Sequence, residues 1–176
     1  MNGTAAVYLI TGVQAAGKST VAQALAARLP RAAHVRGDTF RRFIVSGRAD
    51  MGPEPGKEAL AQLRLRHRLA ADATDTYAEA GFSVVLQDVV LGEMLPWLVR
   101  LIRTRPLYVV VLAPSPEAVT QREAGRDKRA YGAFTVEDLD RTLRETTPRI
   151  GLWLDSSGQT PEETVDEILA RATPYE

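Results

Sequence analysis

The sequence lacks cysteine, and this absence excludes a disulfide framework and any zinc site built on cysteine ligands. It also lacks a charge excess, because 22 basic residues balance 22 acidic ones, so no general attraction to nucleic acid or an anionic membrane is expected. The apolar run 5–10 is too short to span a membrane and lacks the basic flank of a targeting segment. We therefore expect a cytoplasmic protein, with no nucleic-acid or membrane partner, that forms one domain over residues 1–176.

Strand and helix patterns alternate along the chain. Short aliphatic runs predict five strands, at residues 7–11, 32–36, 82–87, 107–112 and 150–154. Helical patterns fall between and after them, at residues 18–29, 39–45, 57–80, about 93–103, 115 onward, 136–145 and 160–172. The sequence therefore predicts an α/β fold with a parallel sheet covered by helices on both faces. Ligands of such sheets bind at the carboxyl ends of the strands.

The loop after the first predicted strand matches the phosphate-binding pattern G-x-x-x-x-G-K-[ST] without a gap. Its residues are Gly12, Val13, Gln14, Ala15, Ala16, Gly17, Lys18 and Ser19, with Thr20 next in the following helix. Glycines let the backbone curl so that its N–H groups and the helix N-terminus face a phosphate. Lys18 is expected to reach the β- and γ-phosphates of ATP, and the Ser19 hydroxyl is expected to bind Mg²⁺. A strand before the loop and a helix after it make a chance match improbable.

Several classes of P-loop protein do not fit the rest of the sequence. A GTPase needs an Asn-Lys-x-Asp motif, but Asn2 is the sole asparagine. The segment 156–160, Ser-Ser-Gly-Gln-Thr, only faintly resembles a transporter-ATPase signature, and it lies between a strand and a capped helix. A motor ATPase usually has Asp-Glu where this chain has Asp88-Val89. Small kinases of nucleotides and metabolites remain.

Two carboxylates follow predicted strands at the same edge of the sheet as the loop. Asp38 is expected to act as a base toward an acceptor hydroxyl, or else to be only the N-cap of the next helix. If the acceptor is a phosphate instead, Arg41 is the candidate cation. Asp88 is expected to hold Mg²⁺ directly or through water, to contact the substrate, or to cap a helix.

Arginines recur in the predicted lid, residues 122–134. Arg122, Arg126 and Arg129 are spaced so that they can share one face and close over the phosphates; the alternative is a solvated face paired with acidic neighbours. His67 and His34 are interpreted as packed or surface residues, and Trp97 and Trp153 as core.

With these motifs in view, the chain resembles the chloramphenicol phosphotransferase-like family of small P-loop kinases. The P-loop, Gly37-Asp38, the segment 88–92 (Asp-Val-Val-Leu-Gly) and the segment 122–132 carry the resemblance. Adenylate kinases have Asp-Gly-Phe-Pro-Arg in place of the third motif. The segment 37–41, Gly-Asp-Thr-Phe-Arg, is also similar to the Gly-Asp-x-x-Arg of adenylyl-sulfate kinases. The segment through the fifth strand departs from the family's pattern.

The resemblance implies a three-layer P-loop fold with strand order 2-3-1-4-5, an ATP–Mg²⁺ donor, and Asp38 as the base. Ser157 and Gly158, in the turn 155–160, are expected near the adenine because similar loops pack there in related kinases. The leading hypothesis is an ATP-dependent kinase that phosphorylates a hydroxyl of a small organic molecule, with an antibiotic among the candidates. The alternatives are a nucleotide or nucleoside kinase and a nucleotide-binding regulator.

Overall fold

A five-stranded sheet forms the centre of the computed structural model, which describes residues 5–125 and 133–176. The strands are β1 (Val7–Gly12), β2 (Ala32–Arg36), β3 (Ser83–Gln87), β4 (Leu107–Leu112) and β5 (Leu152–Leu154). They run parallel in the order β2-β3-β1-β4-β5, which confirms the predicted fold class and strand order. The helices are α1 (Lys18–Arg28), α2 (Asp38–Arg42), α3 (Lys57–Glu79), α4 (Met94–Leu101), α5 (Pro116–Ala124), α6 (Val136–Arg141) and α7 (Pro161–Arg171), with a π-helical turn η1 (Thr142–Thr146) after α6.

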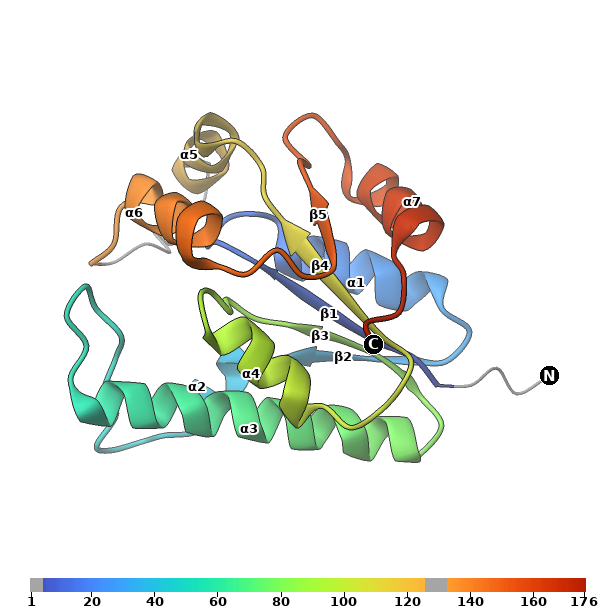
Figure 1. Cartoon of the computed structure of the whole chain (residues 1–176), viewed down its shortest axis with the longest axis horizontal. Helices are drawn as coiled ribbons and strands as arrows, with labels where there is room; N and C mark the ends of the chain where they lie inside the picture. Colours follow the sequence, from blue (N-terminus) through green and yellow to red (C-terminus); the bar gives the residue numbers. More distant parts are fainter. Residues whose placement is uncertain (1–4, 126–132) are drawn as a thin grey trace.

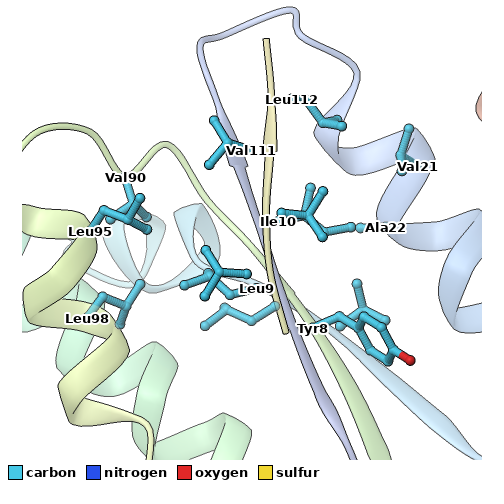
Figure 2. Close-up of a cluster of buried hydrophobic side chains, with 14 of the residues drawn as sticks. Tyr8, Leu9, Ile10, Val21, Ala22, Val90, Leu95, Leu98, Val111 and Leu112 are labelled. Carbon is cyan, nitrogen blue, oxygen red and sulfur yellow. The ribbon is translucent and has the colours of Figure 1, made fainter. Parts of the chain in front are cut away.

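Helices cover both faces of the sheet. Figure 1 shows α1 and α7 on one side, α3 and α4 on the other, and α5 and α6 near the end at which β4 finishes. Figure 2 shows the consequence for β1, where Leu9 points toward Leu95 and Leu98 of α4 while Ile10 points toward Ala22 of α1. All of β1 is buried, because a central strand covered on both faces has no solvent side. This explains why the strand carries no charged residue, with the sequence Val-Tyr-Leu-Ile-Thr-Gly.

The long helix α3 is confirmed, but its leucines do not form its core face. Leu60 and Leu69 are each 39% exposed, and Leu65 is 47% exposed. The buried face is made of small and polar residues instead: Ala59, His67, Ala70, Ala71, Thr74, Asp75 and Ala78. Alanines let a helix approach a sheet closely, so the larger side chains are turned away from it. The leucines of α3 therefore follow helical spacing, but the face that packs on the sheet is the one formed by these small and polar residues.

Helix ends agree with the capping signals in the sequence. The Ser115 hydroxyl accepts a hydrogen bond from the Ala118 N–H, with Pro116 at the first position of α5. Thr160 and Glu163 form the expected capping box of α7. The short helix predicted at 39–45 is only α2, which begins at Asp38 and ends at Arg42. Within residues 5–125 and 133–176, no helix is both long and apolar enough to cross a membrane.

Candidate active site

The P-loop connects the buried end of β1 to the first turn of α1. Gly12 has φ +151°, and a Cβ there would lie 2.5 Å from the Leu112 carbonyl oxygen of β4. Gly17 has φ +93°, a conformation that favours glycine. The backbone between them curls, and the Lys18 Nζ donates a 2.7 Å hydrogen bond to the Val13 carbonyl. Lys18 is buried, whereas Ser19 and Thr20 are exposed at the start of α1.

A cavity of about 1030 Å³ opens over the P-loop. Gln14 to Thr20 form one part of its wall, and residues of α2, α3 and the loop between them form the opposite part. Of the other predicted site residues, the cavity brings together Asp38, Arg41, Asp88 and Arg122. Gly12, Val13, Ser157 and Gly158 do not line it.

Arg122 of α5 joins two loops beside the cavity. Its guanidinium donates to the Ala16 carbonyl of the P-loop at 3.1 Å and to the Ser156 carbonyl at 2.7 Å. The turn 155–160 is held further by Ser157, whose Oγ accepts a 2.8 Å bond from the Ser115 N–H. Hydrogen bonds from Ser157 lower the pKa of Asp155. Arg126 and Arg129 lie outside the described residues, as does most of the predicted lid.

Asp38 lies in the first turn of α2 and lines the cavity. The N-cap of α2 is Gly37, and the Asp38 carboxylate makes an ion pair with Arg42 instead of a cap bond. The N-cap interpretation of Asp38 is therefore wrong. Arg41 also has a carboxylate partner, since its Nε donates a 2.7 Å hydrogen bond to Asp50 Oδ1. This bond lowers the pKa of Asp50.

Asp88 is buried at the end of β3 and belongs to a network that the sequence interpretation missed. Arg66 of α3 donates hydrogen bonds to both carboxylate oxygens of Asp88, from Nε to Oδ2 at 2.7 Å and from a terminal nitrogen to Oδ1. The Val89 N–H donates to Oδ1 at 2.8 Å, and His67 Nε2 lies 3.6 Å from Oδ2. Burial lowers the pKa of His67, so its ring is neutral at pH 7 and is not an ionic partner. Asp88 does not cap the helix that follows, because the N-cap of α4 is Glu93, so the cap interpretation of Asp88 is wrong.

Burial acts to lower the pKa of Arg66, but the charge of Asp88, its hydrogen bonds and the charge of Asp38 together raise the pKa. The Arg66 guanidinium therefore stays charged. The spacing of the alanines in α3 indicates which face of the helix packs on the sheet, and Arg66 lies on that face. Ala59 and Ala70 are seven residues before and four residues after Arg66, so an alanine face, once recognised, would have turned Arg66 toward the sheet.

Comparison with protein families now adds to this geometry. The profile of the AAA domain family matches residues 7–148, which is most of the chain. The chain belongs to this family. No curated protein matches the sequence.

Solved structures share the P-loop kinase fold of this AAA domain over nearly its whole length. A sugar kinase from Janibacter sp. HTCC2649 is 20% identical, with a TM-score of 0.68 over 96% of this chain and 94% of that one. The Mycobacterium tuberculosis APS kinase CysC, solved with AMPPNP and APS, is 18% identical, with a TM-score of 0.67 over 95% and 96%. The Deinococcus radiodurans tunicamycin resistance protein is 18% identical, with a TM-score of 0.66 over 97% and 99%. At these identities the likeness shows the fold alone.

The AAA domain has groups that suit a nucleotide with a magnesium ion. The glycine-rich curve, Lys18 and the exposed Ser19 hydroxyl lie at one wall of the cavity. No cluster of three or more His, Cys, Asp or Glu within the described ranges makes a metal cage. Mg²⁺ is usually bound by one or two protein oxygens, water and substrate phosphates. Because Arg66 grips both Asp88 oxygens, contact through water suits Asp88 better than direct ligation.

Proposed function

We propose that this chain is an ATP-dependent kinase that transfers the γ-phosphoryl group to a hydroxyl of a small organic molecule. The observation that carries this proposal is that the Asp38 carboxylate and the P-loop line the same cavity. A nucleotide-binding regulator would not need an acidic group opposite its phosphate site. The resemblance to chloramphenicol phosphotransferase-like kinases supports the same reading of Asp38. We propose a cytoplasmic setting, which supplies ATP and which a sequence without cysteine suits.

In the proposed reaction the acceptor oxygen attacks the γ-phosphorus of ATP. The new P–O bond forms as the bond to the ADP oxygen breaks, and the hydroxyl proton passes to Asp38. Lys18 and the P-loop N–H groups stabilise the negative charge on the phosphates, and Ser19 and Asp88 hold the Mg²⁺, Asp88 through water. Arg122 braces the P-loop against the turn 155–160, and Arg126 and Arg129 remain candidates for closing over the phosphates. Most of the acceleration comes from positioning and charge stabilisation.

The proposal is tested by ADP formation from ATP with a panel of hydroxylated antibiotics, sugars, nucleosides and nucleoside monophosphates. Antibiotics and sugars are included because the fold neighbours include a tunicamycin resistance protein and a sugar kinase. With an active acceptor, Asp38→Asn should lower kcat by about 100-fold or more while nucleotide affinity is unchanged. Asp72→Asn is the matched control, because Asp72 is an exposed carboxylate of α3 that does not line the cavity.

Full activity of the Asp38→Asn variant would overturn the base role. If only nucleoside monophosphates stimulated ADP formation and Arg41→Ala removed the stimulation, a nucleotide kinase would replace the proposal. Nucleotide binding with no stimulated turnover by any acceptor would favour a regulator.

A further inference from the structure

Resting on the proposed function, we infer that the acceptor is an uncharged alcohol with an apolar body. The inference concerns the part of the cavity that lies away from the P-loop, formed by α2, the loop 43–56 and α3. We call this part the acceptor end.

Apolar side chains form much of the wall of the acceptor end. They are Phe40, Phe43, Ile44, Met51, Leu65 and Leu69. Three of them are strongly exposed, with Phe43 at 69%, Leu65 at 47% and Leu69 at 39%. Large apolar groups gathered at a cavity mouth are the usual sign of a ligand that covers them. A sugar or other fully polar acceptor would leave them in water.

Charge at the acceptor end disfavours an anionic acceptor. Asp38 and Asp50 line the acceptor end, and Asp38 is paired with Arg42. Two guanidinium groups also line it, those of Arg41 and Arg66. Each of these arginines already has a carboxylate partner, Asp50 for Arg41 and Asp88 for Arg66. A phosphate or sulfate on the acceptor would have to break one of these pairs and leave its carboxylate without a cation, so the pairs select against an anionic acceptor.

The size of the cavity allows two ligands at once. At about 1030 Å³ it lies at the upper limit of roughly 300–1,000 Å³ found for single-ligand sites. A nucleotide on the P-loop therefore leaves space at the acceptor end for a molecule with both a hydroxyl near Asp38 and an apolar body against α3.

The test is calorimetric titration of the chain with Mg²⁺–AMPPNP already bound. Methyl, phenyl and octyl β-D-glucoside present the same hydroxyl groups on bodies of increasing apolar area, and octyl glucoside is kept below its micelle concentration. We expect octyl and phenyl glucoside to bind at least about tenfold more tightly than methyl glucoside, since each buried methylene favours binding. Glucose 6-phosphate and AMP should bind no better than methyl glucoside.

Leu69→Gln should remove most of the preference for the octyl chain. Leu60→Gln should leave it unchanged, because Leu60 is equally exposed at 39% on the same helix but does not line the cavity. Equal affinity for the three glucosides, no binding of any of them, or tighter binding of glucose 6-phosphate or AMP would overturn the inference.

The two proposals fail in different ways. Tight binding of octyl glucoside without phosphorylation of any alcohol would leave the acceptor end as inferred and remove the kinase proposal. Phosphorylation of a charged acceptor alone would leave the kinase and overturn the apolar acceptor.

Discussion

At the scale of single residues, the ion pair between Arg66 and Asp88 is a buried contact of the candidate site whose loss should be measurable. The Asp88 side chain is 2% exposed and that of Arg66 is 16% exposed, so neither charge is well solvated. Arg66→Ala should lower the free energy of unfolding by about 3 kcal/mol, because it leaves a buried carboxylate without its cation. Urea denaturation measures this loss. Arg66→Lys should be intermediate, since it keeps the charge but not the two-nitrogen grip.

Arg64 and Arg68 are matched controls for this prediction. Both are exposed arginines of the same helix, two residues to either side of Arg66. Their alanine variants should unfold within about 0.5 kcal/mol of the wild type. A loss below about 1 kcal/mol for Arg66→Ala would show that Asp88 finds another partner.

His34 in β2 should make the fold sensitive to mild acid. Burial, aided by the charge of Arg36, lowers its pKa from 6.5 to about 4. Nδ1 lies 2.9 Å from the Gln23 Oε1, so Nδ1 carries the proton of the neutral ring. The buried Nε2 has no hydrogen-bond partner, so a second proton on Nε2 would have no acceptor. Between pH 6.5 and 4 the unfolded chain binds the extra proton and the folded chain resists it. Stability from this group is therefore complete above pH 6.5 and is lost as pH falls toward 4.

The measurement is the free energy of unfolding across this pH range for the wild type and His34→Asn. Asparagine can still donate toward Gln23 but does not titrate, so the variant should lose less stability as pH falls. Parallel pH profiles would show that His34 is not the responsible group. His67 acts in the same direction through its own lowered pKa, and its contribution should remain in the variant.

How much of the site could be predicted depends on the distance in sequence between partners. The P-loop is a contiguous pattern, and Asp38 and Asp88 follow strands that must end at one edge of a parallel sheet. These positions were therefore predictable from local signals. Arg66 was missed, because its pairing depends on how α3 rotates about its axis, and the sequence indicates that rotation only through the spacing of alanines and not through a motif.

At the scale of elements, the close approach of β2 to the end of β3 depends on Gly37. A Cβ at this position would lie 2.2 Å from Asp88 Oδ2 and 2.9 Å from Asp88 Cβ. Gly37→Ala should therefore push β2 and the start of α2 away from Asp88, at a cost of about 1–3 kcal/mol in unfolding free energy. Denaturation measures the cost, and Gly52→Ala is the control, since an added Cβ there meets nothing within 4 Å.

The same variant should reduce turnover more than it reduces nucleotide affinity, because Asp38 is the next residue and moves with the backbone. Unchanged stability and turnover in Gly37→Ala would mean that the junction has more freedom than its packing indicates. The role of Gly37 was visible in the sequence only as part of a motif. Its physical reason, a side chain of another strand occupying the space of its Cβ, appears only in three dimensions.

Helices and strands themselves were largely predictable, and the errors have local causes. The strands β2 and β4 agree with their predicted bounds, because Pro and Gly or a charged residue end each aliphatic run. The helix predicted at 136–145 continues as the π-helical turn η1 after Arg141, an irregularity that hydrophobic spacing does not encode. Helical spacing does not say which face of α3 packs on the sheet, and Leu63, Leu65 and Leu69 line the cavity instead.

At the scale of the whole molecule, the cavity joins elements distant in sequence. Its lining includes residues of the P-loop, α2, α3, the end of β3, α5 and the turn before α7. A ligand that touches them together should therefore stabilise the fold as a unit. Residues 1–176 are predicted to form one domain, and this can be tested with the same ligand.

Mg²⁺–AMPPNP at 100 times its Kd should stabilise the chain by about 2.7 kcal/mol, which is roughly 5–10 °C in Tm for a chain of this size. Trp97 in α4 and Trp153 in β5 report on separate elements, and far-UV circular dichroism reports on all helices. For one domain the two signals should give one transition that shifts together.

The Lys18→Ala variant should lose most of the shift, because the ammonium that meets the phosphates is gone. The Lys57→Ala variant should keep the shift, because Lys57 lies at the start of α3 outside the cavity lining. Two transitions, of which only one moves with the nucleotide, would divide the chain into units that fold separately.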